Sequence, residues 1–373
     1  MDTKDKDFEL ASPREMMLDT TMSPLVIENE AMNGQVRQVV GPDEELIVLP
    51  GQKPKKSPTP LQDSLRRLRR DKRAMVSLGV IMLFILIPIF GPLIYQHFGG
   101  IYNSVTYGKI GPNVYHSPYH IELDRQDELF SGQYWLGTDG VGRDLFARLM
   151  LGMLVSITVA LLVEIVDVVL GITVGVLAGF YGGWIDQLLA RFTDIMFAFP
   201  GLLFAILLTG IFGTTADTAF ASLPLIGANG NARLILVSLA LAFTAWPLMA
   251  RYVRGQTLQL KEQQFVEAAR TSGTSDYKII TRHIIPNLSS IVVVAATLDI
   301  SGTIIGEAGL SLLGLGVQSP GSSIGLMISD ASSSLETHPW EVLLPSLFLT
   351  ILVLAFSFLG DGLRDAFDPR SKD

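Results

Sequence analysis

The stretch "EAARTSGTSDYKIITRHIIPN", residues 267–287, is polar and partly basic, yet apolar runs long enough to cross a membrane stand on both sides of it. Good helix formers and an apolar patch at i, i+3, i+4 spacing (Phe265, Ala268 and Ala269) predict a first helix. Gly273 then permits the left-handed backbone that ends a helix. The sequence therefore predicts two short helices joined by a turn, which we call the elbow (residues 264–285).

The second helix of the elbow should begin at Ser275, a residue type that caps helix starts. It should present Tyr277, Ile280 and Ile284 on one face. Pro286 disfavours helical geometry at the residue before it, so we expect this helix to stop at Ile285. The elbow is thus expected to be separate from the apolar run that follows it.

The composition places the chain among integral membrane proteins. Of its 373 residues 49% are hydrophobic, the mean hydropathy is +0.40, and the apolar residues come in blocks rather than at amphipathic spacing. The absence of cysteine excludes disulfides, a thiol nucleophile and a cysteine-ligated metal. We expect no cofactor, no metal site and no nucleic-acid partner.

Six apolar runs approach the length of about 20 residues that a membrane-spanning helix needs. They are residues 75–95, 151–180, 195–212, 234–250, 289–310 and 342–360. Pro200 should bend the start of the third run. The predicted fold class is all-α, a polytopic membrane protein with six transmembrane helices. A disordered tail over residues 1–60 should precede them, because that segment mixes charges, Pro and Gly without periodicity.

The distribution of basic residues predicts the orientation, since Lys and Arg accumulate on the cytoplasmic side. The run "RRLRRDKR", residues 66–73, stands just before the first span. Placing the N-terminus inside puts 23 of the 28 lysines and arginines in cytoplasmic segments. Both termini and the elbow are then expected to be cytoplasmic.

Two interpretations of the elbow stay open from its residues alone. In the first, the elbow rests on lipid headgroups, with Lys278 and Arg282 near phosphates. In the second, it binds a protein partner. Its small first face favours a partner, because small side chains suit close approach by another surface. Glu267 would pair with Arg270 at i, i+3, or with a basic group of that partner.

Four acidic residues lie inside the predicted spans, where charges are costly and usually face the bundle interior, a cavity or a partner. Glu164 and Asp167 share a face of the second span, Asp299 lies near the middle of the fifth, and Glu307 lies close to its outer end. In one interpretation they line a translocation path and meet the amino end of a peptide. In a second they hydrogen-bond to neighbouring helices, and in a third they couple transport to protons. These three interpretations stay open.

Gly171, Gly175 and Gly179 recur at four-residue spacing on one face of the second span. This small-xxx-small pattern lets helix backbones approach closely. It indicates helix packing, within the fold or between subunits, rather than substrate contact.

The elbow resembles the EAA loop of bacterial ABC-importer permeases. In that family the loop forms coupling helices that sit in a groove of the ATPase subunit, and ATP-driven closure of the ATPase pair passes through this contact to the spans. The resemblance implies ATPase-coupling roles for Glu267, Ala268, Ala269, Gly273, His283 and Pro286.

Four more stretches resemble the C-type permease subunit of the dipeptide/oligopeptide (peptide/nickel) transport family. They are "WLGTDGVGRDLFARLMLG" (135–152), "GFYGGWIDQLLARFTDIMFAFP" (179–200), "GEAGLSLLGLGVQSP" (306–320) and "GDGLRDAFDPR" (360–370). With the elbow they cover the chain in order from about residue 61 to 370, and Glu307 matches the family's usual glutamate.

The resemblance implies the type I ABC importer permease fold. The expected organisation is a basic juxtamembrane segment at 61–74, the first span and an extracytoplasmic loop at 75–150, the permease domain at 151–361 with coupling helices at 264–285, and a cytoplasmic C-terminus at 362–373.

The leading functional hypothesis is half of the pore of an ATP-driven importer for short peptides. It implies a homologous second permease, two ATPase subunits and an extracytoplasmic binding protein. The chain has no Walker A motif, HExxH or GxSxG, so it is not expected to be an enzyme. The alternatives are an ion-coupled carrier that uses the acids of spans two and five, and a non-transporting membrane anchor.

Overall fold

The structure is a computed structural model that describes residues 60–106, 116–222 and 232–367. The chain divides into two compact units, 1–57 and 58–373, and all described residues belong to the second. The tail predicted over residues 1–60 lies outside the described residues, except that Pro60 begins the short helix α1 (Pro60–Arg70).

Helices make up the regular structure of the described ranges, in which no β-strand forms. Six helical segments in these ranges are long and apolar enough to cross a membrane. They are the part Lys72–His97 of α2 (Lys72–Thr106), α3 (Leu145–Tyr181), α5 (Gly201–Ala219), α6 (Arg233–Leu260), the segment that ends with α9 (Ile285–Leu312), and α11 (Pro339–Phe367). The six predicted spans and the all-α fold class are confirmed.

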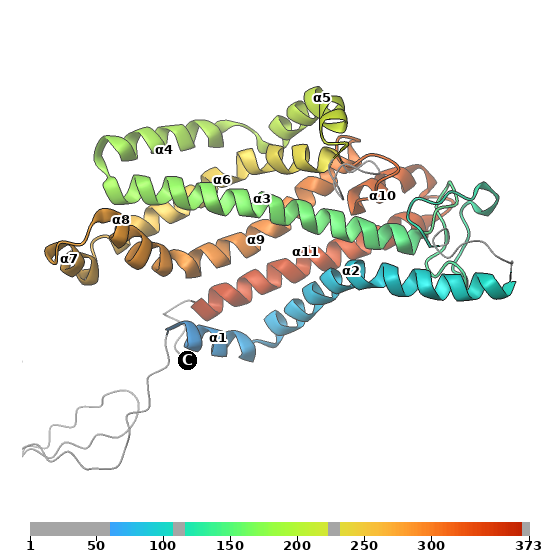
Figure 1. Ribbon diagram of the computed structural model, residues 1–373, viewed down its shortest axis with the longest axis horizontal. Coiled ribbons are helices and arrows are strands. Elements are labelled where there is room, and N and C mark those ends of the chain that lie inside the picture. The colour runs from blue at the N-terminus through green and yellow to red at the C-terminus, as the bar shows by residue number, and fades with distance from the viewer. Residues whose placement is uncertain (1–59, 107–115, 223–231, 368–373) are drawn as a thin grey trace, which may run out of the picture. The chain divides into compact units, whose positions relative to one another are not determined.

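Helix α3 occupies the middle of the bundle. It packs along α6 for most of its length and also contacts α2, α9 and the short helix α10 (Ile324–Ala331) (Figure 1). Gly171, Gly175 and Gly179 face α6, and a Cβ atom at Gly175 would lie only 2.6 Å from the carbonyl oxygen of Ala250. The structure therefore places the glycine stripe in a close helix contact within this chain.

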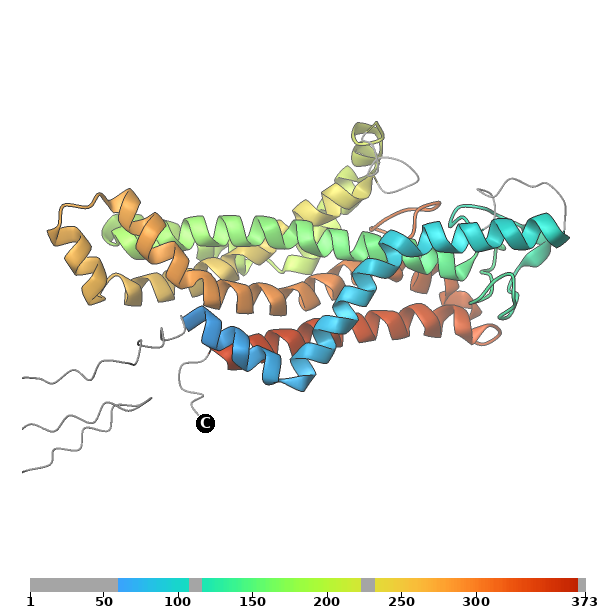
Figure 2. The ribbon, with the colours of Figure 1, turned by 60° about the horizontal axis from the view of Figure 1, so that its bottom comes forward.

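Helix α11 lies against α2 and α9 and completes the bundle (Figure 2). Small residues again mark the contacts, since Gly362 faces Ala74 of α2 and Gly360 faces Leu298 of α9. The basic helix α1 contacts the end of α11.

The prediction that the third span begins at residue 195 is wrong. Ile195 belongs to α4 (Gly183–Ala198), a separate helix, and the chain is extended at Phe199 and Pro200 before α5 begins at Gly201. A proline disfavours helical geometry at the residue before it, so Pro200 separates two helices instead of bending one. Helix α4 packs against α3 and α6 (Figure 1).

The prediction that the second elbow helix stops at Ile285 is also wrong. Helix α8 (Asp276–Ile279) continues through a π-helical turn, Ile280–Ile284, directly into α9. The N–H of Ile285 donates to the carbonyl of Ile280, five residues back. This wider turn accommodates the ring of Pro286 and its missing N–H in the first turn of α9. The second elbow helix and the fifth span therefore form one continuous helical segment, Asp276–Leu312.

Candidate functional site

The elbow lies at one end of the bundle, and α10 lies toward the other (Figure 1). Its first helix, α7 (Gln264–Thr271), ends in a hydrogen-bonded turn. The N–H of Thr274 donates to the Ala269 carbonyl (3.0 Å) and that of Gly273 to the Arg270 carbonyl (2.9 Å). Gly273 has φ +75°, a conformation that glycine adopts without steric cost. Gly273 thus fixes the direction of α7 relative to α8.

Three apolar side chains anchor the elbow to the bundle. Val266, Ile279 and Ile284 are fully buried in a cluster that includes Phe180 of α3 and Val253 of α6. Ile279 and Ile284 are five residues apart, and the π-helical turn brings this spacing to one side. A displacement of α7 or α8 would therefore disturb the packing of these side chains against α3 and α6.

The predicted apolar face of the second elbow helix is wrong in part. Tyr277 is 75% exposed, Ile280 is half-buried, and Ile279 takes the buried position instead. The prediction assumed α-helical spacing, whereas the π-helical turn changes which residues align. Ser275 does occupy the N-cap position, but its side chain makes no capping hydrogen bond.

The outer surface of the elbow is formed by Phe265, Glu267 and Ala268, which are all exposed, and we call it the α7 surface. The His283 ring lies 6.2 Å from that of Phe265, centre to centre. Glu267 forms no ion pair with Arg270, whose guanidinium lies 5.2 Å from the centre of the Phe180 ring instead. The α7 surface therefore offers an apolar ring, a small side chain and an accessible carboxylate.

Three of the four acids within the spans come together between α3 and α9. Glu164, Asp167 and Asp299 each place a carboxylate oxygen within 4.8 Å of the others, and we call them the acid triad. Glu164 and Asp167 are only 7% and 2% exposed, while Asp299 is half-buried.

Both carboxylate oxygens of Glu164 and one of Asp167 lack a hydrogen-bond partner in the part of the chain that the structure describes. No lysine or arginine of that part forms an ion pair with the triad. Buried carboxylates at this spacing repel one another and lose hydration. They therefore form a site that a cationic group would occupy favourably.

Glu307 lies apart from the triad and has a different environment. It is 1% exposed, and its carboxylate accepts hydrogen bonds from Ser156 Oγ on α3 and Ser311 Oγ on α9, both at 2.7 Å. These two hydrogen bonds join α3 to α9 and satisfy both carboxylate oxygens of Glu307. The sequence offered no signal for Ser156, because its contact with Glu307 depends on how the helices pack.

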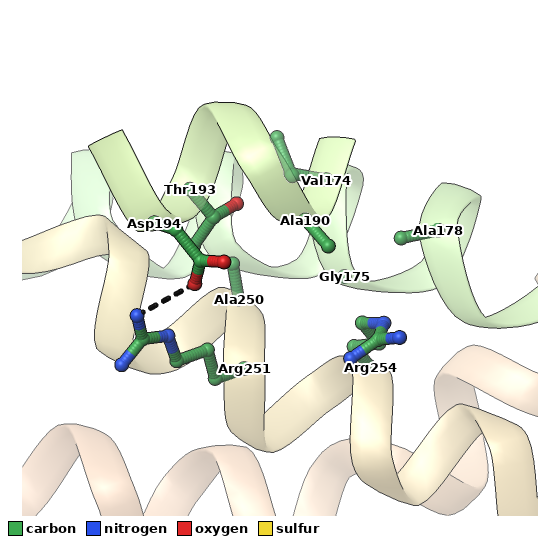
Figure 3. Close-up of a pocket in the computed structure, with 9 residues that line it drawn as sticks. All are labelled: Val174, Gly175, Ala178, Ala190, Thr193, Asp194, Ala250, Arg251 and Arg254. Atoms are coloured by element: carbon green, nitrogen blue, oxygen red, sulfur yellow. Dashed lines mark hydrogen bonds and ion pairs between the residues drawn. The ribbon is translucent and has the colours of Figure 1, made fainter. Parts of the chain in front are cut away.

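A cavity of 280 Å³ opens between α3, α4 and α6 (Figure 3). Arg251 reaches Asp194 at its edge, with a guanidinium-to-carboxylate distance of 2.8 Å. Arg254 donates to Asp186 at 2.8 Å, and this bond lowers the pKa of the Asp186 carboxyl below its ordinary value. The two ion pairs hold α4 against α6, and no local sequence pattern predicts either of them.

Six helical segments long and apolar enough to cross a membrane, with a helical elbow anchored at one end of the bundle, define a polytopic membrane protein. The sequence matches the family described as the binding-protein-dependent transport system inner membrane component over residues 171–373. It also matches the N-terminal TM domain of oligopeptide transport permease C over residues 59–105. The chain belongs to this permease family.

Two relatives illustrate the match. The dipeptide transport system permease protein DppC of Alkalihalophilus pseudofirmus is 34% identical over 315 residues, which are 84% of this chain and 91% of the relative. The glutathione transport system permease protein GsiD of Escherichia coli O6:K15:H31 is 36% identical over 327 residues, 88% of this chain and 96% of the relative. The chain is thus a membrane-spanning permease subunit of an ABC importer with the type I fold, and the ion-coupled alternative is not supported.

Proposed function

We propose that this chain forms half of the translocation pathway for short peptides in a bacterial inner membrane. Its partners would be a homologous second permease, two ATPase subunits and an extracytoplasmic substrate-binding protein. The observation that carries this proposal is the elbow, which exposes the α7 surface while Val266 and Ile279 bind it to the bundle. The names of the relatives, dipeptide and glutathione permeases, support a peptide substrate.

In this proposal the elbow is cytoplasmic, both termini are cytoplasmic, and the end of the bundle near α10 faces the binding protein. The concentration of Lys and Arg in the segments that the sequence predicts to be cytoplasmic supports this orientation. The segment organisation expected from the sequence (61–74, 75–150, 151–361 with 264–285, and 362–373) is part of the same proposal.

The first experiment tests the contact between the elbow and an ATPase. We expect an ATPase to copurify with the tagged wild-type chain from its native membrane in mild detergent. Glu267→Arg reverses an exposed charge and should deplete that ATPase at least about tenfold. The substitution removes the attraction between Glu267 and a basic group of the ATPase and puts two positive charges against each other, which is unfavourable at an interface. Quantitative mass spectrometry of the eluate measures both.

Glu262→Arg is the matched control, since Glu262 is also exposed and lies just before α7. It should retain the ATPase. If no ATPase copurifies with the wild type, or if both charge reversals deplete it equally, the α7 surface does not bind an ATPase.

We further propose that the acid triad receives the positively charged amino end of the peptide during translocation. Both carboxylate oxygens of Glu164 and Oδ1 of Asp167 lack a hydrogen-bond partner among the described residues, and Asp299 leaves the triad partly exposed. A charge-assisted hydrogen bond contributes about 1.5–3 kcal/mol, so its loss should reduce transport about tenfold or more.

This role predicts a specific pattern of uptake. The wild-type importer should prefer a free dipeptide to its N-acetylated form, and Glu164→Gln should slow uptake of the free dipeptide while leaving the acetylated one nearly unchanged. Uptake of both labelled peptides into vesicles loaded with ATP measures the preference. Glu262→Gln, which neutralises an acid outside the triad, should behave as the wild type. Equal losses for both peptides in Glu164→Gln would assign the triad a structural role.

A further inference from the structure

A second group of ligand-type side chains lies at the opposite end of the bundle from the elbow. Asp127, in the segment between α2 and α3, meets His338 and Glu341 at the start of α11. Each of the three offers one ligand atom within 4.8 Å of the others, and Nδ1 of His338 lies 3.8 Å from a carboxylate oxygen of Asp127. The group joins segments more than two hundred residues apart in the chain.

Each of the two carboxylates of this group has one buried oxygen without a hydrogen-bond partner among the described residues. Glu341 is 1% exposed, and its Oε1 atom has no hydrogen-bond partner among the described residues. The same holds for Oδ1 of Asp127. A buried unpaired carboxylate is costly, so two facing one another require a compensating positive charge or a shared proton.

The arginines around the start of α3 already have acidic partners. Arg143 pairs with Asp139 at 2.7 Å and with Asp330 at 3.3 Å. Arg148 reaches the same two acids, at 3.5 Å and 3.2 Å. The acids of that network balance its two arginines, so neither of these arginines forms an ion pair with Asp127 or Glu341.

We propose that Asp127, His338 and Glu341 bind one divalent transition-metal ion, for which Zn²⁺ is the probe. An imidazole nitrogen with two carboxylate oxygens is a donor set that Zn²⁺ accepts, at bond lengths of about 2.0–2.2 Å. Such bonds require ligand atoms about 3–3.5 Å apart, so the three ligand atoms would have to move about 1 Å closer together to bind the ion. The ion would fasten the segment around Asp127 to the start of α11.

This inference does not depend on the proposed substrate or on the ATPase. The metal would stabilise the fold, because it links two segments at the end of the bundle. Its test therefore uses metal content and thermal unfolding rather than transport.

The chain should be purified through a tag without histidines, treated with a chelator, and dialysed against Zn²⁺ or Ca²⁺. We expect one Zn²⁺ per chain, a lower unfolding temperature after chelation, and recovery with Zn²⁺ but not with Ca²⁺. Glu341→Gln should weaken Zn²⁺ binding by at least about tenfold, the loss that removing even a supporting residue of a metal site causes.

Two further variants keep the test decisive. Asp127→Asn should reproduce the loss, and asparagine tolerates the φ of +52° at this position. Glu336→Gln, which changes an exposed acid near His338, should bind Zn²⁺ as the wild type does. If the wild type shows no zinc-dependent change, or if Glu341→Gln and Asp127→Asn bind as the wild type does, the proposal fails. Stabilisation of the wild type by mild acid without any zinc effect would assign a shared proton instead and would also overturn the proposal.

Discussion

Replacing Gly273 by valine should leave the permease in the membrane but reduce ATP-driven uptake by at least about tenfold. Gly273 has φ +75°, a left-handed conformation that costs an L-residue about 1–2 kcal/mol, and more for a β-branched one. No atom lies within 4 Å of the position of an added Cβ, so valine would act through the backbone and not through a clash. The turn would lose the bonds from Thr274 to Ala269 and from Gly273 to Arg270.

The consequence would be a misdirected α7. Val266 would be pulled against its buried position, or the α7 surface would turn away from its partner. Either result separates ATP hydrolysis from movement of the spans. Uptake of labelled peptide and the ATPase rate of the reconstituted complex, measured together, should show hydrolysis that no longer responds to substrate.

Two substitutions serve as controls for this prediction. Gly273→Asn should retain most of the activity, because asparagine adopts the left-handed conformation more readily than other L-residues. Gly255→Val changes an exposed glycine of α6 with open space around it and tests for a general effect of added bulk. Should valine and asparagine at position 273 behave alike, the direction of the turn is not what the ATPase contact requires.

The sequence predicted the features that depend on local pattern. The six spans follow from uninterrupted apolar length, and the left-handed turn at Gly273 follows from the one residue type that adopts it freely. The stripe of Gly171, Gly175 and Gly179 indicated close packing, although only the structure shows that α6 is the helix it meets.

The features that the sequence missed depend on what surrounds a residue. Pro286 was expected to end a helix, but a π-helical turn absorbed it because Ile279 and Ile284 gain burial by aligning. Asp299 lies close to Glu164 and Asp167 because of the register of α9 against α3, and a local sequence pattern does not predict that register. The group of Asp127, His338 and Glu341 joins even more distant segments, and the sequence analysis expected no metal site there.

The second large effect is expected at Gly175, where valine should prevent the chain from accumulating in the membrane. A Cβ atom there would lie 2.6 Å from the Ala250 carbonyl oxygen and 2.7 Å from Val253 Cβ. The carbonyl belongs to the α6 backbone and cannot turn aside, so α3 and α6 must move apart to admit the new side chain. Overpacking of this kind costs about 1–3 kcal/mol per site, and a valine adds two more methyl groups.

Other glycines provide a graded comparison, because the atoms that a Cβ would meet differ in how far they can move. At Gly91 of α2 the closest atom is Sδ of Met150 (2.6 Å), near the end of a flexible side chain, whereas Gly210 of α5 has open space. We therefore expect the unfolding temperature to fall most for Gly175→Ala, less for Gly91→Ala, and scarcely for Gly210→Ala. Membrane level by immunoblot and thermal unfolding in detergent measure this order. Equal stability of the three alanine variants would mean that the α3–α6 contact tolerates separation, and the elbow could then not transmit movement through Val266 and Val253 to a rigid pair of spans.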